Sequence, residues 1–236
     1  IHIMITKQEL LRTNIVLGTA LVDMYGKCGM IRKAQEVFDA LLVRDSISWT
    51  ALITGYVHEG HFKEALDCYR QLQKEGLSPN AATFACILKA CGNLGLVEAG
   101  LEIHAEVQKR QLLVKNDVVI GTALVDMYAK CGMLVKAQEV FNELPGHDVV
   151  SWNALITGYV DQGLCGEAIK CFRKMLDERF SPNSVTFTCI LKACGSLGLL
   201  EKGEEIHDKV QKEGLVGSSI MLDNALVDMY AKCGAF

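Results

Sequence analysis

The sequence lacks the features that zinc modules, membrane proteins and basic nucleic-acid-binding proteins require. Its ten cysteines include no C-x-x-C pair, the spacing of zinc knuckles and thioredoxin-like redox sites. No stretch of about 18 residues is apolar and free of charge, which excludes a transmembrane helix on hydropathy. The formal net charge is −4, without the excess of Lys and Arg typical of a generally basic nucleic-acid binder. Any contact with RNA or DNA must therefore depend on the local placement of charge.

What the sequence does contain is repetition. The string ALVDMY begins at Ala20, Ala123 and Ala225, with spacings of 103 and 102 residues. Within this period, glycines recur after apolar stretches at gaps of 31, 35 and 36–37 residues. A glycine just past a helix end can adopt the left-handed conformation that terminates the helix, so each one predicts a helix–turn–helix junction. These glycines are Gly29, Gly60, Gly95, Gly132, Gly163, Gly198 and Gly234.

The apolar residues between these glycines follow the period of an α-helix. Leu155, Ile156 and Tyr159 share one helical face, and the equivalent positions of the other repeats carry similar residues. A single helical pair cannot bury its apolar face, whereas several stacked pairs can. We therefore predict an all-α fold in which helix–turn–helix repeats stack as an α-solenoid.

The glycine rhythm divides the chain into eight segments, of which the first and last are partial repeats. We therefore expect the sequence to be a piece of a longer array, so the targeting of the full-length protein is not readable from it. The expected segments are 1–14, 15–45, 46–80, 81–117, 118–148, 149–183, 184–219 and 220–236.

Three of the segments resemble the repeats of the pentatricopeptide family. Residues 148–159, DVVSWNALITGY, are similar to the 35-residue P repeat, and residues 123–132, ALVDMYAKCG, to the short S repeat. Residues 187–194, FTCILKAC, resemble the L repeat. The S-like segments are 15–45, 118–148 and the partial 220–236. The P-like segments are 46–80 and 149–183, and the L-like segments are 81–117, 184–219 and the partial 1–14. This S–P–L order resembles the PLS subclass, found in plant organelle RNA-editing factors.

The resemblance implies a right-handed superhelix that binds single-stranded RNA, one base per repeat, with the RNA running 5′ to 3′ from the N- to the C-terminus. In this family the fifth and the last residue of a repeat select the base, a mode of single-strand recognition that suits helical repeats. The base-selecting positions are Thr19 with Asp45, Thr50 with Asn80, Ala85 with Asp117, Thr122 with Asp148, Asn153 with Asn183, Thr188 with Ser219, and Asn224, for which the sequence holds no partner.

These pairs imply the target G-A-x-G-(C/U)-x. Within the family, a Thr–Asp pair selects G, Thr–Asn selects A, and Asn–Asn selects C with U tolerated. The two L repeats are expected to read their bases weakly, because alanine offers no hydrogen bond and Thr–Ser is not a well-defined pair.

The resemblance also implies residues that flank the base and residues that contact phosphate. The second residue of each repeat is an apolar wedge beside the base, and a lysine near the end of the first helix contacts phosphate. The flanking residues are Val16, Ile47, Val119, Val150, Val185 and Met221. The lysines, Lys27, Lys130 and Lys232, occur only in the S repeats, which predicts modest affinity with a shallow dependence on salt.

Two other classes of function are a zinc-dependent enzyme and a protein-binding scaffold. The tripeptide His104-Ala-Glu106 matches the H-x-E of zinc deaminases, but the P-C-x-x-C that completes that site is missing. We therefore expect no metal site, no cofactor and no enzymatic activity in this chain, although the full-length parent could carry a deaminase-like extension. The alternative is a protein-binding solenoid scaffold, with small accessory editing factors docked on the L repeats. The expected location is the mitochondrion or the chloroplast.

Overall fold

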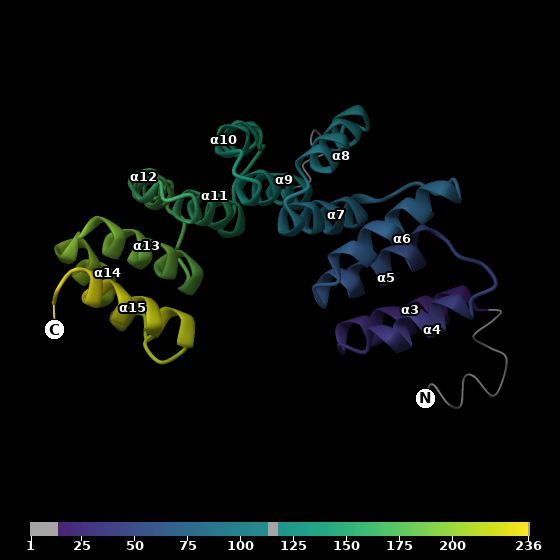
Figure 1. The fold of residues 1–236 in the computed structure, drawn as a ribbon, viewed down its shortest axis with the longest axis horizontal. Coiled ribbons are helices and arrows are strands. Elements are labelled where there is room, and N and C mark those ends of the chain that lie inside the picture. Colours follow the sequence, from purple (N-terminus) through teal and green to yellow (C-terminus); the bar gives the residue numbers. More distant parts are fainter. Residues whose placement is uncertain (1–13, 113–117, 236) are drawn as a thin grey trace. The chain divides into compact units, whose positions relative to one another are not determined.

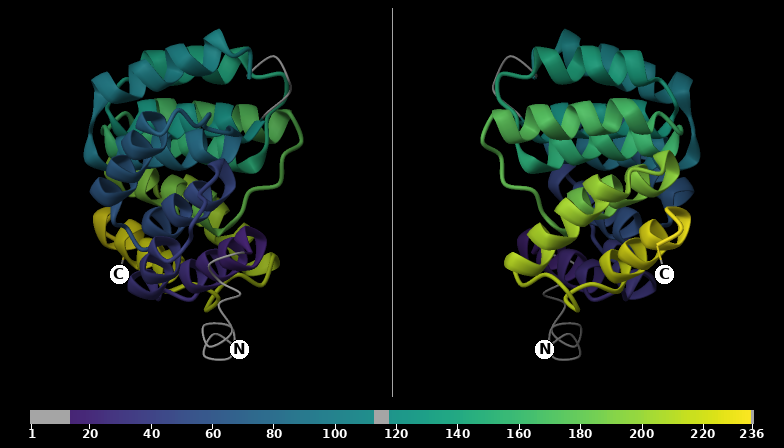
Figure 2. Two further views of the ribbon diagram at one scale, coloured as in Figure 1. Left: turned by 90° about the vertical axis from the view of Figure 1, so that its right-hand side faces the viewer. Right: turned by 90° about the vertical axis from the view of Figure 1, so that its left-hand side faces the viewer.

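The computed structural model describes residues 14–112 and 118–235, and in these ranges the chain forms thirteen helices and no strand (Figure 1 and Figure 2). The predicted all-α fold is therefore confirmed. None of these helices combines the length and apolar character that crossing a membrane would need. The helices are α3 (Ile15–Lys27), α4 (Ile31–Asp39), α5 (Ser46–His58), α6 (Phe62–Lys74), α7 (Ala81–Leu94), α8 (Val97–Lys109), α9 (Val118–Lys130), α10 (Leu134–Glu143), α11 (Val149–Asp161), α12 (Cys165–Asp177), α13 (Ser184–Leu197), α14 (Leu200–Lys212) and α15 (Ile220–Lys232).

Polar N-cap residues precede the odd-numbered helices other than α9. Asp45 precedes α5, and its side chain accepts hydrogen bonds from the backbone N–H groups of Ile47 and Ser48. The Ser48 hydroxyl lies 2.9 Å from the Asp45 backbone nitrogen, which completes a capping box. Helices α7, α11 and α13 start with the same device. Asx followed three residues later by Ser or Thr is therefore the local signal that starts these helices.

Glycine ends the same helices, as the spacing predicted. All seven glycines used to define the repeat have a positive φ, from 66° to 78°. At each junction the next residue closes the helix end; for example, the Met30 N–H donates to the Tyr25 carbonyl at 2.9 Å. The turn after each glycine is short, so the following helix folds back on the one just ended.

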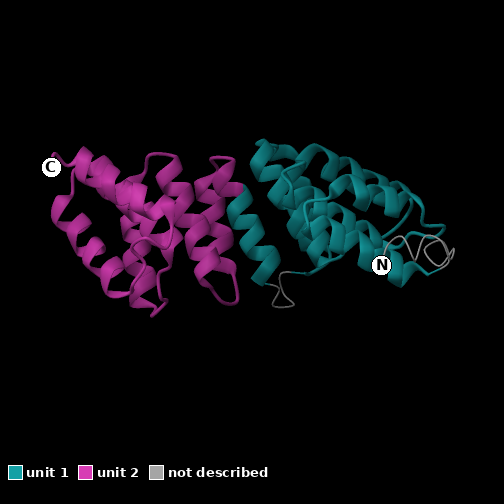
Figure 3. Ribbon diagram, turned by 90° about the horizontal axis from the view of Figure 1, so that it is seen from below, with its two compact units in different colours: residues 1–127 teal, residues 128–236 magenta. Residues whose placement is uncertain are grey.

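The chain divides into two compact units, residues 1–127 and 128–236 (Figure 3). Within the first unit, α3 packs against α4 and also against α5, and α5 packs against α6 and α7. Within the second, α11 packs against α12 and α13, and α13 packs against α14 and α15. Helices α3, α5, α11 and α13 thus each contact their own partner helix and the next odd-numbered helix, which is the neighbour-to-neighbour packing of an α-solenoid.

The apolar faces predicted from the sequence form the core of each unit. Leu155 and Ile156 are fully buried in α11, and Phe172 of the partner helix α12 is equally inaccessible. Adjacent first helices also approach closely: a Cβ added to Gly55 of α5 would lie 3.1 Å from the Cα of Gly26 in α3. This close packing brings the same face of successive first helices side by side.

The ten cysteines, all in the described ranges, carry free thiols. Four are buried, as expected for small apolar residues, whereas Cys28 is exposed. Burial raises the pKa of Cys68 to about 12 and of Cys171 to about 11. These thiols are therefore neutral at physiological pH and unsuited to act as nucleophiles.

Candidate nucleic-acid interface

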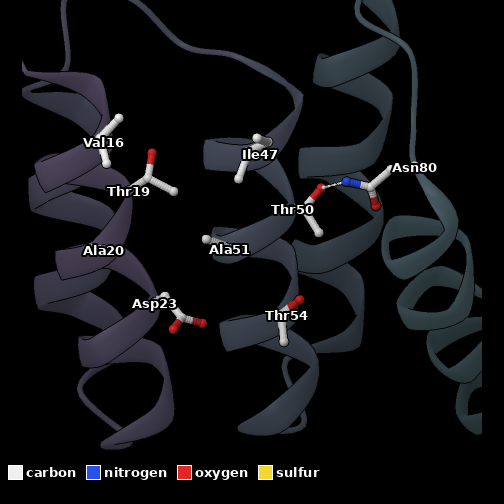
Figure 4. Close-up of a pocket in the computed structure, with 9 residues that line it drawn as sticks. All are labelled: Val16, Thr19, Ala20, Asp23, Ile47, Thr50, Ala51, Thr54 and Asn80. Carbon is white, nitrogen blue, oxygen red and sulfur yellow. Dashed lines mark hydrogen bonds between the residues drawn. The ribbon is translucent and has the colours of Figure 1, made fainter.

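A pocket of about 390 Å³ lies between α3 and α5 (Figure 4). Four residues of each helix line it at the spacing i, i+3, i+4 and i+7, which is one face of an α-helix. Val16 and Thr19 begin the set on α3, and Ile47 and Thr50 occupy the same places on α5. Asn80, which precedes α7, completes one side of the pocket. The full lining is Val16, Thr19, Ala20, Asp23, Ile47, Thr50, Ala51, Thr54 and Asn80.

The two residues predicted to select a base lie in contact in both P repeats. Asn80 Nδ2 donates a hydrogen bond to Thr50 Oγ1 at 3.2 Å, the bond drawn in Figure 4. Asn153 Nδ2 donates to Asn183 Oδ1 at 3.0 Å. Thr50 and Asn153 are 9% and 8% exposed, while Asn80 and Asn183 are exposed. Each pair therefore joins a recessed side chain to an accessible one.

The last residue of a repeat also caps the helix that follows it. The Thr83 N–H donates to Asn80 Oδ1 at 2.9 Å, and the Ser151 N–H donates to Asp148 Oδ1 at 2.7 Å. Ser219 occupies the N-cap of α15 without a side-chain bond. The carboxylates and amides at these positions thus use Oδ1 for the cap and keep a second atom for other contacts. Sequence reasoning missed this double use, although Ser or Thr three residues later signals it.

The first S repeat shows a looser arrangement than the P repeats. Both Thr19 and Asp45 are half-buried, and no hydrogen bond joins these two described residues. Thr122 Oγ1 is buried and has no hydrogen-bond partner. Asp148, in the second unit, is half-buried at the start of α11.

Among the described residues of the L repeats, no hydrogen bond joins two predicted selectors as in the P repeats. Ala85 is half-buried on α7, and its predicted partner Asp117 lies outside the described residues. Thr188 is 5% exposed, and its hydroxyl donates to the Ser184 carbonyl at 2.7 Å. Asn224, in the last partial repeat, is exposed on α15.

All six predicted flanking residues are exposed, from 51% for Val185 to 75% for Val16. A single exposed valine is ordinary on a protein surface. Six large apolar side chains exposed at the same place in six of the seven repeats from residue 15 onward, with Ala82 in the seventh, are a pattern that packing alone does not explain. In the first unit they are Val16, Ile47 and Val119, and in the second Val150, Val185 and Met221.

Two of the three lysines predicted to contact phosphate form ion pairs with aspartates. Lys27 Nζ lies 2.7 Å from Asp23 Oδ2, and Lys232 Nζ lies 2.6 Å from Asp228 Oδ2. Both pairs join residues four apart on one helix. Lys130 is exposed at the end of α9. The prediction of phosphate contacts did not take into account the aspartates that lie four residues before Lys27 and Lys232.

His104 is the histidine of the H-x-E tripeptide that resembles a zinc deaminase site. His104 is half-buried on α8, and its counterpart His207 has Nδ1 2.9 Å from the Tyr230 hydroxyl. In the part of the chain that the structure describes, no three His, Cys, Asp or Glu side chains are grouped so that they could hold a metal ion.

The repeats and their stacking define the chain as an α-solenoid of helical repeats, and comparison with known families agrees. Residues 44–93 and 147–196 match the PPR repeat family, and residues 19–45, 122–149 and 185–215 match the PPR repeat. This chain belongs to the pentatricopeptide repeat family.

Relatives of known name support the same assignment. A chloroplastic pentatricopeptide repeat-containing protein of Arabidopsis thaliana is 37% identical over 234 residues, which is 99% of this chain and 37% of that protein. A putative mitochondrial one from the same plant is 38% identical over 218 residues, 92% of this chain and 34% of that protein. The chain thus spans little more than a third of these relatives, whose organelles are the two expected from the sequence.

Solved structures show the same fold. The pentatricopeptide repeat protein PPR10 in complex with an 18-nt psaJ RNA element superimposes with a TM-score of 0.73 at 19% identity, covering 92% of this chain and 32% of that one. PPR10 from maize gives a TM-score of 0.65 at 22% identity, covering 91% and 31%.

Proposed function

We propose that this chain binds single-stranded RNA in a sequence-specific manner, one base per repeat, and acts as the address module of a plant organellar C-to-U editing factor of the PLS subclass. The proposed target is G-A-x-G-(C/U)-x. The reaction itself would be performed by another domain of the longer protein. Family membership, relatives from plant organelles and the RNA-bound PPR10 neighbour support this proposal.

The observation that carries the proposal is the pocket between α3 and α5. Its rim holds two exposed apolar side chains, Val16 and Ile47, one from each helix. Polar groups of Thr19, Thr50 and Asn80 lie deeper or to the side. A planar base can be held by apolar contact on both faces while polar groups bond its edge, which is how proteins read unstacked bases.

The helix caps explain why Asp and Asn would select different bases. Asn80 commits Oδ1 to the cap, so its amide nitrogen is the group that remains for a base. Asp45 commits one oxygen to the cap, so its second oxygen remains. An amide donates a hydrogen bond and a carboxylate accepts one. The Watson–Crick edge of adenine accepts at N1 and suits Asn, whereas guanine donates from N1 and N2 and suits Asp.

The test is to exchange one pair and follow one base. Replacing Thr50 by Asn and Asn80 by Asp should move the preference at the second base from A to U, because the N3–H of uracil donates to a carboxylate. Discrimination of about 1–3 kcal/mol is expected for such a contact. Fluorescence anisotropy with four RNAs that differ only at this base measures it. An unchanged preference would refute the proposed register.

A second candidate function is docking of accessory editing factors on the L repeats. It is favoured by exposed leucines at the turns between the L-repeat helices, namely Leu96, Leu197 and Leu199. Replacing Leu197 and Leu199 by Ser should abolish co-purification of a small editing factor while leaving RNA binding unchanged. Equal co-purification by the variant would rule out this surface.

A further inference from the structure

The residues that line the pocket define four positions on each first helix that face the proposed RNA path. The fourth of them, seven residues after the apolar wedge, is Asp23 on α3 and Thr54 on α5. In the L repeats the residue at this place is a lysine: Lys89 is seven residues after Ala82 on α7, and Lys192 is seven after Val185 on α13. Seven residues are close to two helical turns, so the lysine shares the face of the wedge.

These lysines differ from those of the S repeats in their surroundings. Lys27 and Lys232 each lie within 2.7 Å of an aspartate oxygen on the same helix, so each pair is locally neutral. Lys89 and Lys192 are exposed, and no carboxylate in the described ranges lies within 4.0 Å of either ammonium group. Each L repeat therefore presents a full positive charge at this place.

The neighbouring first helix adds uncharged groups beside each lysine. Thr54 on α5 lies 3.4 Å from the Cys86 thiol, which is three residues before Lys89. Thr157 and Cys189 form the equivalent contact at 3.3 Å beside Lys192. At Cys189 the charge of Lys192 lowers the thiol pKa while that of Asp161 raises it, although burial makes the net shift upward. The charge of Lys192 thus acts on the Cys189 thiol, and the charge of Lys89 lowers the pKa of the equivalent Cys86 in the same way.

We propose that Lys89 and Lys192 bind phosphate groups of the single-stranded RNA, so that the L repeats hold the backbone while the P and S repeats select bases. This inference rests on the proposed RNA-binding function. The proposal also explains why segment 81–117 can hold Ala85 at the base-selecting position, where it offers a base no hydrogen bond. This repeat would contact the RNA backbone through Lys89 instead.

The variant that tests this is Lys89→Gln, which keeps a long helix-forming side chain and removes the charge. Affinity should fall by the same factor for an RNA containing GAUGCU and for a mismatched copy. The slope of log K against log salt should become shallower by about 0.7, the value for one phosphate contact on a single strand. Lys89→Arg should restore both the affinity and the slope.

Lys63→Gln is the matched control, because it removes the same charge from the exposed side of α6, outside the pocket. It should leave the salt slope unchanged, and Lys27→Gln should change it less than Lys89→Gln does. Equal effects of Lys63→Gln and Lys89→Gln, or an unchanged slope in Lys89→Gln, would overturn the inference while sequence-specific binding by the unmodified chain would still stand. No RNA binding by the well-folded unmodified chain would overturn both proposals.

Discussion

Replacing Asn80 separates its two roles, capping a helix and contacting the base. In Asn80→Asp, Oδ1 still accepts from the Thr83 N–H, which it does at 2.9 Å in the wild type. Asp and Asn rank equally as N-caps, so the free energy of unfolding should change by no more than about 0.5 kcal/mol. The bond from Nδ2 to Thr50 Oγ1 is lost, but the Thr50 hydroxyl can redirect its one proton from the Ser46 carbonyl, 2.6 Å away, to the new carboxylate, so the site loses little.

Asn80→Ala, in contrast, removes both the cap and the contact with Thr50. Loss of an N-cap costs about 0.5–2 kcal/mol. The Thr50 hydroxyl keeps its bonds to the Ser46 carbonyl and to Thr83, so no further buried group is left unsatisfied. The unfolding free energy should therefore fall by about 0.5–2 kcal/mol, with the effect centred on the start of α7.

Urea unfolding followed by circular dichroism measures the stability of both variants, and anisotropy with RNAs that differ at the second base measures selection. Asn80→Asp should change the preferred base from A to G without loss of stability. Asn80→Ala should lose stability and discrimination together. If Asn80→Asp kept the preference for A, or if no base preference existed at this place in the wild type, Asn80 would be a helix cap alone.

Three further outcomes are expected from packing, exposure and titration. Gly158→Ala should lower the free energy of unfolding by up to about 2 kcal/mol, because the added Cβ would lie 2.5 Å from the Cβ of Ala129 on the neighbouring helix. Gly166→Ala, with open space around it, should leave that free energy unchanged or raise it by up to about 1 kcal/mol in the same urea titration. Ile47→Ala should weaken RNA binding with little change in unfolding, since this side chain is 64% exposed, and an unaltered Kd would remove it from the proposed interface. Stability should decline as pH rises from about 9 towards 11. Burial raises the pKa of Cys68 to about 12 and of Cys171 to about 11, so these thiols lose their protons at lower pH in the unfolded chain than in the folded one. Cys171→Ala should make that decline less steep.

The fold followed from the sequence because its signals are local and repeated. Each of the seven glycines that mark the repeat has a positive φ. The apolar faces predicted from the helical period are buried, as at Leu155 and Phe172. Helix ends and core faces depend on residues within one or two turns, so a single sequence suffices to locate them.

The details of the candidate site followed less completely, because they depend on contacts between elements. The contact of Asn153 with Asn183 joins residues 30 apart and could be placed only through the family resemblance. The pairing of Lys27 with Asp23 could be predicted from their spacing of four residues, because residues four apart on a helix face each other. Thr83 enters the site through the capping box at Asn80, a role that a list of base-selecting positions does not contain.

The most direct test of the account is binding to a short single-stranded RNA containing GAUGCU, compared with AGUACU, which exchanges the purine at the three predicted purine positions. Fluorescence anisotropy at two salt concentrations separates specific from electrostatic binding. A clear preference for GAUGCU is expected at both concentrations. Equal binding to the two RNAs, or binding to neither by a well-folded helical sample, would contradict it.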